Sequence, residues 1–254
     1  MHRKWTIMTS LTLISLVFSC RITTGGEESL SAGRKGEEGL KSIAGGMERT
    51  RKDRVIVVLG ASYAKGLTEI PMEGITVINK GVGGEQSSEM LARFKRDVVT
   101  ERPEAVVIWG FINDIFRSDR DKVSATLERT RSNITGMVDM ARANGIKPIL
   151  ATEVTIREKS GLKEMVATWI GRAMGKEGYQ DYINRHVLST NEWIRAYARK
   201  QAIPLLDFQP LLADTLGKRG KVYATDDGSH ISPAGYSRLS RHAAMVVGEV
   251  IGRP

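Results

Sequence analysis

Ser62 is the residue whose setting first suggests chemistry. It stands two residues after Gly60, at the end of the apolar run 55–59, so the sequence predicts a buried strand that ends in a tight turn. A serine there can point its hydroxyl away from the strand, and the next helix start can offer a backbone N–H to a developing oxyanion. A phosphate-binding loop is excluded, because Leu67 follows Gly66 where that motif needs lysine. A nucleophilic serine also needs a base.

The chain has four histidines, so the base can be sought by elimination. His2 lies in the N-terminal apolar segment, and His186 and His242 fall within predicted helices. His230 lies in the polar stretch DDGSHISPAGY, between the last predicted strand and the last predicted helix. This loop is expected at the carboxyl ends of the strands, on the same edge as the serine.

An acid that orients the histidine is expected in the same loop. Asp227 precedes His230 by three residues, so a turn can bring its carboxylate onto the imidazole, fix the tautomer and stabilise the imidazolium. Asp226 is a competing acid that the sequence alone does not exclude.

Two further positions are candidates for an oxyanion hole. Asn113, in INDI after the third predicted strand, offers a side-chain amide. Gly84, in NKGVGGEQSS after the second predicted strand, lets a backbone N–H approach closely. Each has a purely structural alternative, since Gly84 also suits a turn and Asn113 a helix cap.

These residues need a sheet that brings strand ends together. Apolar runs at 55–60, 75–79, 105–110, 146–152 and 203–208 indicate five strands buried on both faces. Helices are predicted over 85–100, 122–144 and 181–201, and a last one begins at Ser232-Pro233. The alternation predicts one open, parallel α/β sheet with helices on both faces, spanning residues 54–254.

Residues 157–180 interrupt this alternation. Their apolar side chains fall on one helical face, at Leu162, Met165, Val166, Trp169, Ile170 and Ala173. Two interpretations remain open: a lid or acyl-binding wall, and a helix packed on the core.

The N-terminal segment predicts export. Residues 1–20 hold two basic residues, then an apolar run too short to span a bilayer, then Ser19-Cys20. This layout resembles the signal and lipobox of bacterial lipoproteins, which implies lipid attachment at Cys20 and anchoring at a membrane surface. An ordinary signal peptide is the alternative. Residues 21–53, rich in glycine and charge, predict a flexible tether.

Composition narrows the function classes. One cysteine excludes an internal disulfide framework. The formal charge is +9, but the basic residues are scattered without the interleaved aromatics of a nucleic-acid surface, so no nucleic-acid partner is predicted. The sequence leaves the oligomeric state open.

Taken together in chain order, the serine, glycine, asparagine and Asp-x-x-His stretches resemble the SGNH (GDSL-type) hydrolase family over residues 55 to about 250. The resemblance implies a flavodoxin-like α/β/α sandwich of about five parallel strands. It implies Ser62 as nucleophile, His230 as base, Asp227 as its orienting acid, and an oxyanion hole of the Ser62 and Gly84 N–H groups with the Asn113 amide. No metal or other cofactor is implied.

The sequence departs from the family pattern at two places. Ala61 replaces the usual aspartate of Gly-Asp-Ser. Phe111 stands where a glycine is expected two residues before the asparagine, with Gly110 shifted by one. Neither change removes a reacting group, but Phe111 is in a position to narrow the pocket or contact an acyl chain.

The function expected is ester hydrolysis through an acyl-enzyme, on lipid acyl esters or on O-acetyl groups of glycans. The alternatives are acyl transfer to a sugar hydroxyl with the same residues, and a binding module that keeps the fold without catalysis.

Overall fold

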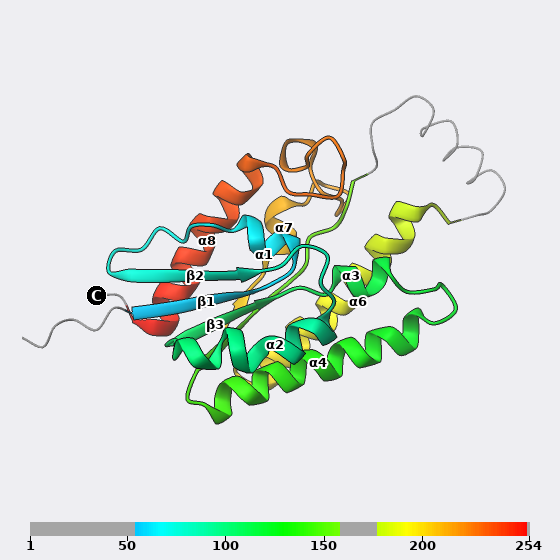
Figure 1. Cartoon of the computed structure of the whole chain (residues 1–254). Coiled ribbons are helices and arrows are strands. Elements are labelled where there is room, and N and C mark those ends of the chain that lie inside the picture. The colour runs from blue at the N-terminus through cyan, green and yellow to red at the C-terminus, as the bar shows by residue number, and fades with distance from the viewer. Residues whose placement is uncertain (1–53, 158–176, 253–254) are drawn as a thin grey trace, which may run out of the picture. The chain divides into compact units, whose positions relative to one another are not determined.

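The computed structural model describes residues 54–157 and 177–252, which form a five-stranded sheet covered by helices on both faces (Figure 1). The predicted signal segment with Cys20, the predicted tether and the apolar stripe at 162–173 lie outside the described residues.

The sheet is entirely parallel and its strands run in the order β2-β1-β3-β4-β5. The strands are β1 (Arg54–Gly60), β2 (Ile75–Gly81), β3 (Ala105–Trp109), β4 (Lys147–Ala151) and β5 (Leu205–Leu206). The predicted fold class and the five strands are therefore confirmed. Because β1 lies between β2 and β3, the ends of these three strands meet, and the residues after them are neighbours.

The fifth strand is shorter than predicted. Pro204 has no N–H to donate to a ladder, although its carbonyl accepts from the N–H of Leu150 at 3.0 Å. After Leu206 the chain turns into the short helix α7 (Phe208–Leu212). The apolar run 203–208 thus divides between a two-residue strand and a helix that also buries its apolar side chains.

Helices α2 (Ser87–Asp97), α4 (Val123–Ala143) and α6 (Tyr179–Lys200) cover one face of the sheet, and α1 (Ser62–Gly66) and α8 (Pro233–Ile251) cover the other (Figure 1). The predicted helix start at Ser232-Pro233 is confirmed: the Ser232 hydroxyl accepts from the N–H of Gly235 at 3.2 Å. The predicted helix at 85–100 is shorter, with a 3-10 turn η1 (Val99–Glu101) after α2.

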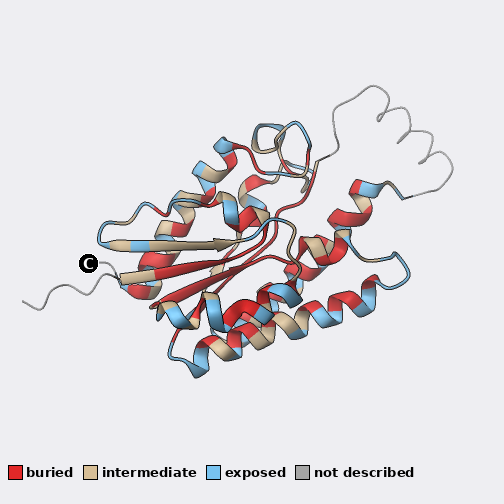
Figure 2. Cartoon of the chain, viewed as in Figure 1, coloured by how far each residue is buried: buried red, intermediate tan, exposed pale blue. Residues whose placement is uncertain are grey.

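Burial is greatest in the central strands, which Figure 2 shows in red. The side chains of β3 and of residues 56–59 in β1 are at most 3% exposed, whereas the edge strand β2 is only half-buried. Among the described residues, no helix is both long and apolar enough to cross a bilayer.

Candidate active site

Ser62 is the first residue of α1, directly after β1. The turn depends on glycine at Gly60, where an added Cβ would lie 1.9 Å from the carbonyl oxygen of Trp109. The first N–H groups of a helix have no partner within the helix, so the half-buried Ser62 presents its hydroxyl and a backbone donor together.

Gly84 and Asn113 follow β2 and β3, the two strands that flank β1, and Asn113 contacts the loop that carries Gly84. Asn113, in the short helix α3 (Ile112–Phe116), donates its side-chain amide to the carbonyl of Glu85 at 2.9 Å. Gly84 has a φ of +81°, the left-handed region that favours glycine. An asparagine amide has two N–H donors, so one remains for a ligand after the bond to Glu85.

Arg93 ties the Ser62 turn to this loop. It is 7% exposed, and its guanidinium donates to the carbonyls of Gly60 at 3.2 Å and Lys80 at 2.8 Å. It also pairs with Glu85 at 2.5 Å and Asp97 at 2.8 Å. Arg93 could not be predicted as a site residue from the sequence, because an arginine on an amphipathic helix is ordinarily exposed.

His230 and Asp227 are in direct contact. The Nδ1 atom of His230 lies 2.6 Å from Oδ2 of Asp227, and Oδ1 accepts from the backbone N–H groups of Ser229 at 2.7 Å and His230 at 2.9 Å. Partial burial opposes ionisation, but these hydrogen bonds, with one from Thr225, hold the pKa of Asp227 well below its usual range. Of the two acids left open by the sequence, Asp227 is the one that contacts the ring.

Tyr63 joins the histidine loop to the serine turn. Its hydroxyl donates to the carbonyl of Ser229 at 2.5 Å, and its ring meets the His230 ring edge-on with centroids 6.5 Å apart. The residue after Ser62 and the residue before His230 are therefore hydrogen-bonded, although 166 positions separate them in the chain. His186 and His242 lie in α6 and α8, as expected.

A buried arginine, Arg219, hydrogen-bonds both to the histidine loop and to Tyr63. Arg219 is 0% exposed and donates to the carbonyls of Ser229 at 3.0 Å and His230 at 2.6 Å, and to the Tyr63 hydroxyl at 2.7 Å. Burial raises the pKa of Tyr63 to about 12, so the hydroxyl stays protonated and donates onward to Ser229.

Glu153 binds the start of α3, the helix that carries Asn113. It is 1% exposed, and its Oε1 accepts from the backbone N–H groups of Phe111 at 2.9 Å and Ile112 at 3.4 Å, at the start of α3. Burial raises the pKa of Glu153 to about 7, against the opposing effect of these bonds and of Arg219. The Phe111 side chain itself is 1% exposed and packs in the core, so the prediction that it contacts an acyl chain or narrows the pocket is wrong.

The Glu153→Gln variant is predicted to flatten the pH dependence of stability. A folded-state pKa near 7, above the ordinary value of 4.5, means that the native protein holds an extra proton between these values. The free energy of unfolding therefore falls by about 3 kcal/mol as pH rises from 4.5 to 7. Glutamine keeps the acceptor for Phe111 without the charge, so urea unfolding at pH 5 and pH 8 should differ by less in the variant.

Glu104→Gln is the matched control for this prediction. A hydrogen bond from Arg54 lowers the pKa of Glu104, so the stability that this carboxylate contributes is lost only below pH 4.5, and Glu104→Gln should destabilise the protein about equally at pH 5 and pH 8. A pH 5 to pH 8 difference that is the same in wild type and Glu153→Gln would contradict the assignment.

Comparison with known proteins identifies the family. The sequence model of the GDSL-like Lipase/Acylhydrolase family matches residues 29–238. The chain belongs to this family. A GDSL-like lipase from Bacteroides thetaiotaomicron has a similar structure, with a TM-score of 0.60 and 24% identity over 79% of this chain and 89% of that one. This likeness agrees with the fold described above.

Two curated relatives are also similar to this member of the GDSL-like family. An uncharacterized lipoprotein of Bacillus subtilis, YqeF, is 25% identical over 175 residues, which is 68% of this chain and 70% of the relative. An acetylxylan esterase of Geobacillus stearothermophilus is 38% identical over 58 residues, only 22% of this chain and 26% of the relative. In the described part of the chain, no group of three or more His, Cys, Asp or Glu is arranged to hold a metal ion.

Proposed function

We propose that the protein hydrolyses esters with Ser62 as nucleophile, His230 as general base and then acid, and Asp227 as the group that orients His230. The observation that carries the proposal is the 2.6 Å contact between Asp227 and His230 Nδ1, in a loop that Tyr63 ties to the serine turn. With Nδ1–H donated to a carboxylate, Nε2 of the neutral ring is free to accept a proton.

The steps follow from these positions. His230 Nε2 takes the proton of the Ser62 hydroxyl as Oγ attacks the ester carbonyl, and the carbonyl oxygen becomes an oxyanion. The N–H groups of Ser62 and Gly84 and the free amide hydrogen of Asn113 stabilise that oxyanion. Collapse breaks the bond to the alcohol oxygen, which leaves with the proton from His230. Water, activated by the same histidine, then releases the acid from the serine.

Exposure at the site supports hydrolysis over acyl transfer. The side chains of His230 and Asp227 are 52% and 43% exposed, so water has ready access to the histidine. Transfer to a sugar hydroxyl requires that water be kept from the acyl-enzyme. The similarity to an acetylxylan esterase supports a short acyl group on a glycan as the substrate class.

Turnover of p-nitrophenyl acetate and p-nitrophenyl octanoate by the purified protein tests this proposal. We expect release of p-nitrophenol from both esters, with the higher kcat/KM on acetate. Absence of turnover on either ester would count against an ester hydrolase, and a marked preference for octanoate would point to lipid acyl esters.

Asn113→Ala is predicted to lower kcat on p-nitrophenyl acetate by about 10²-fold, because one oxyanion donor is lost. The KM should change little, since the bond to the oxygen strengthens only as charge develops. Asn144→Ala, an exposed asparagine at the end of α4, is the control and should retain wild-type kcat. Full activity in Asn113→Ala would remove the residue from the oxyanion hole.

We also propose that the protein is exported and anchored by lipid at Cys20, with residues 1–20 as the signal and 21–53 as the tether. The lipobox-like sequence and the similarity to a protein named as a lipoprotein support this. Metabolic labelling with an alkynyl fatty acid is expected to mark wild type and to fail in Cys20→Ala. Equal labelling of both proteins would refute the anchor and leave an ordinary signal peptide.

A further inference from the structure

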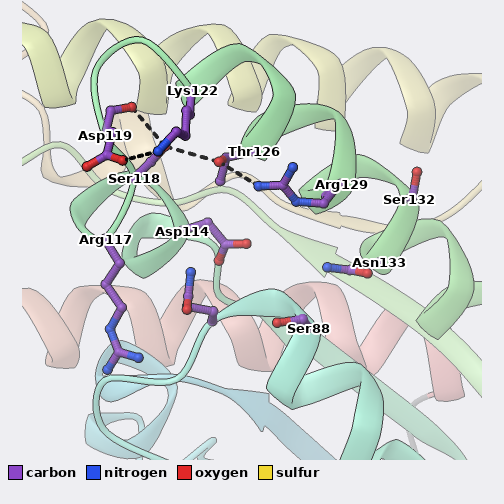
Figure 3. Close-up of a pocket in the computed structure, with 11 residues that line it drawn as sticks. Ser88, Asp114, Arg117, Ser118, Asp119, Lys122, Thr126, Arg129, Ser132 and Asn133 are labelled. Carbon is purple, nitrogen blue, oxygen red and sulfur yellow. Dashed lines mark hydrogen bonds and ion pairs between the residues drawn. The ribbon is translucent and has the colours of Figure 1, made fainter.

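A pocket of about 340 Å³ lies between the start of α2, the helix α3 and the first turns of α4 (Figure 3). This volume is within the range of small-molecule sites. The residues proposed for catalysis do not line it, so its role is a separate question.

The pocket borders the candidate oxyanion hole. Asp114, which lines it, is the residue after Asn113. Gln86, which also lines it, follows Glu85, whose carbonyl accepts the Asn113 amide. The guanidinium of Arg117 lies 3.2 Å from the place that a Cβ on Gly84 would take. The pocket therefore lies beside the loop that carries Gly84 and the helix that carries Asn113.

The lining is polar throughout. Every side chain that lines the pocket carries a hydroxyl, amide, carboxylate or cationic nitrogen, and no aromatic or large aliphatic residue is among them. Such a surface provides many hydrogen-bonding groups, and its apolar area comes from the aliphatic stems of the same polar side chains. It fits a group that is rich in hydroxyls.

Among the described residues, the charges of the pocket leave one guanidinium group without an ion pair and another with only a long one. Asp114 is 4% exposed and is satisfied by the hydroxyl groups of Ser87 at 2.5 Å and Thr130 at 2.9 Å. Asp119 pairs with Lys122 at 2.6 Å. These contacts occupy both carboxylates of the lining.

The two remaining guanidinium groups belong to Arg117 and Arg129. Arg117 has Glu89 at only 3.8 Å, with both side chains about half exposed, and Arg129 donates to the neutral Thr126 hydroxyl at 2.9 Å. In Figure 3, Arg117 extends away from Lys122 and Asp119, whereas Arg129 points toward Thr126. Guanidinium groups in this condition favour a ligand carboxylate, which they bind with paired hydrogen bonds.

We propose that this pocket binds an anionic sugar residue on the alcohol side of the ester, so that the substrate is an O-acetylated acidic glycan. This inference rests on the proposed hydrolysis at Ser62. An acetyl group ends at its methyl carbon and does not reach beyond the oxyanion hole, so the part of the substrate that reaches the pocket is the sugar. Hydroxyls of that sugar meet the serine and amide groups, and its carboxylate meets one of the two guanidinium groups, of Arg117 or of Arg129.

The test compares chemically acetylated polygalacturonate with chemically acetylated dextran, matched for acetyl content, using the full chain without its signal segment. For each variant, kcat/KM on each glycan is divided by that on p-nitrophenyl acetate. We expect wild type to favour the anionic glycan at low salt, and this preference to shrink in 0.5 M NaCl, where charges are screened. In the Arg117→Gln/Arg129→Gln double variant, the ratio for polygalacturonate should fall at least tenfold because KM for that glycan rises. The ratio for dextran should not change.

Lys95→Gln is the matched control, because it removes one exposed positive charge from α2 at a position that does not line the pocket. Its ratios should stay within twofold of wild type. Equal losses on both glycans, an equal fall in Lys95→Gln, or no preference in wild type would overturn the subsite.

Failure of the subsite is distinguishable from failure of the hydrolase. Turnover of p-nitrophenyl acetate with no preference for the charged glycan refutes only the subsite. No turnover of any ester refutes the proposed function. In that case, isothermal titration of wild type and the double variant with trigalacturonate still decides whether the pocket binds a uronate. Binding that is equally tight in both would overturn the proposal.

Discussion

Ser62→Ala is expected to lower kcat on p-nitrophenyl acetate by about 10⁴-fold or more. Alanine keeps the backbone N–H of the helix start, so the oxyanion donors and the fold remain, and only the atom that forms the acyl-enzyme is lost. That atom forms the covalent bond to the acyl group, whereas an oxyanion donor only stabilises a charge. The effect should therefore exceed that of any single oxyanion donor.

Ser237→Ala, an exposed serine on α8, is the matched control and should keep wild-type kcat. A second measurement is covalent labelling with a fluorophosphonate probe. The probe should label wild type on the peptide that contains Ser62, and it should not label Ser62→Ala. Thermal unfolding of the variant should match wild type. Retention of wild-type turnover in a folded Ser62→Ala protein would disprove the mechanism.

The elements were predictable because apolar runs and helix signals are local. The residues of the apolar run Val55–Leu59 are enough to predict β1, and the pair Ser232-Pro233 is enough to predict the start of α8. Both elements are present in the structure. Parallel strands also place their carboxyl ends on one edge, so the meeting of the Ser62, Gly84 and Asn113 segments follows from topology alone. The contact between His230 and Asp227 could also be predicted, because the two residues are three positions apart and a single turn brings them together.

The buried supports of the site could not be predicted in this way. Arg219 stands in the stretch LGKRGKVY, whose glycines and cations are typical of an exposed loop. It is buried because its acceptors come from Tyr63, 156 positions away, and from the carbonyls of the histidine loop. Glu153 likewise follows a strand in a position where a solvent-facing acid is ordinary. It is buried because the start of α3 and Asn191 of α6 both pack against it. A charged residue next to the end of a buried strand was the only available signal.

Arg219→Met is expected to lower kcat on p-nitrophenyl acetate by about 10²-fold, with KM within about twofold, although Arg219 does not touch the substrate. Its guanidinium holds the carbonyls on either side of the Ser229–His230 peptide bond and the Tyr63 hydroxyl at once. Methionine fills the space but donates nothing, so the histidine loop loses the support that fixes the ring relative to Ser62. Stability should fall by about 3 kcal/mol, because the two carbonyls and the Tyr63 hydroxyl lose their charged donor.

Two variants separate positioning from a general loss of stability. Arg195→Met removes a bidentate ion pair with Asp207, at 2.9 Å for both bonds, and should destabilise the protein while leaving kcat near that of wild type. Tyr63→Phe removes the hydroxyl that bridges Arg219 to Ser229, so its effect on kcat and that of Arg219→Met should be less than additive in a double-mutant cycle. If kcat falls equally in Arg195→Met, or if the two effects simply add, then Arg219 stabilises the fold without positioning His230. A coupled loss of kcat would instead mean that the reacting groups, separated by most of the chain, depend on one buried cation for their alignment.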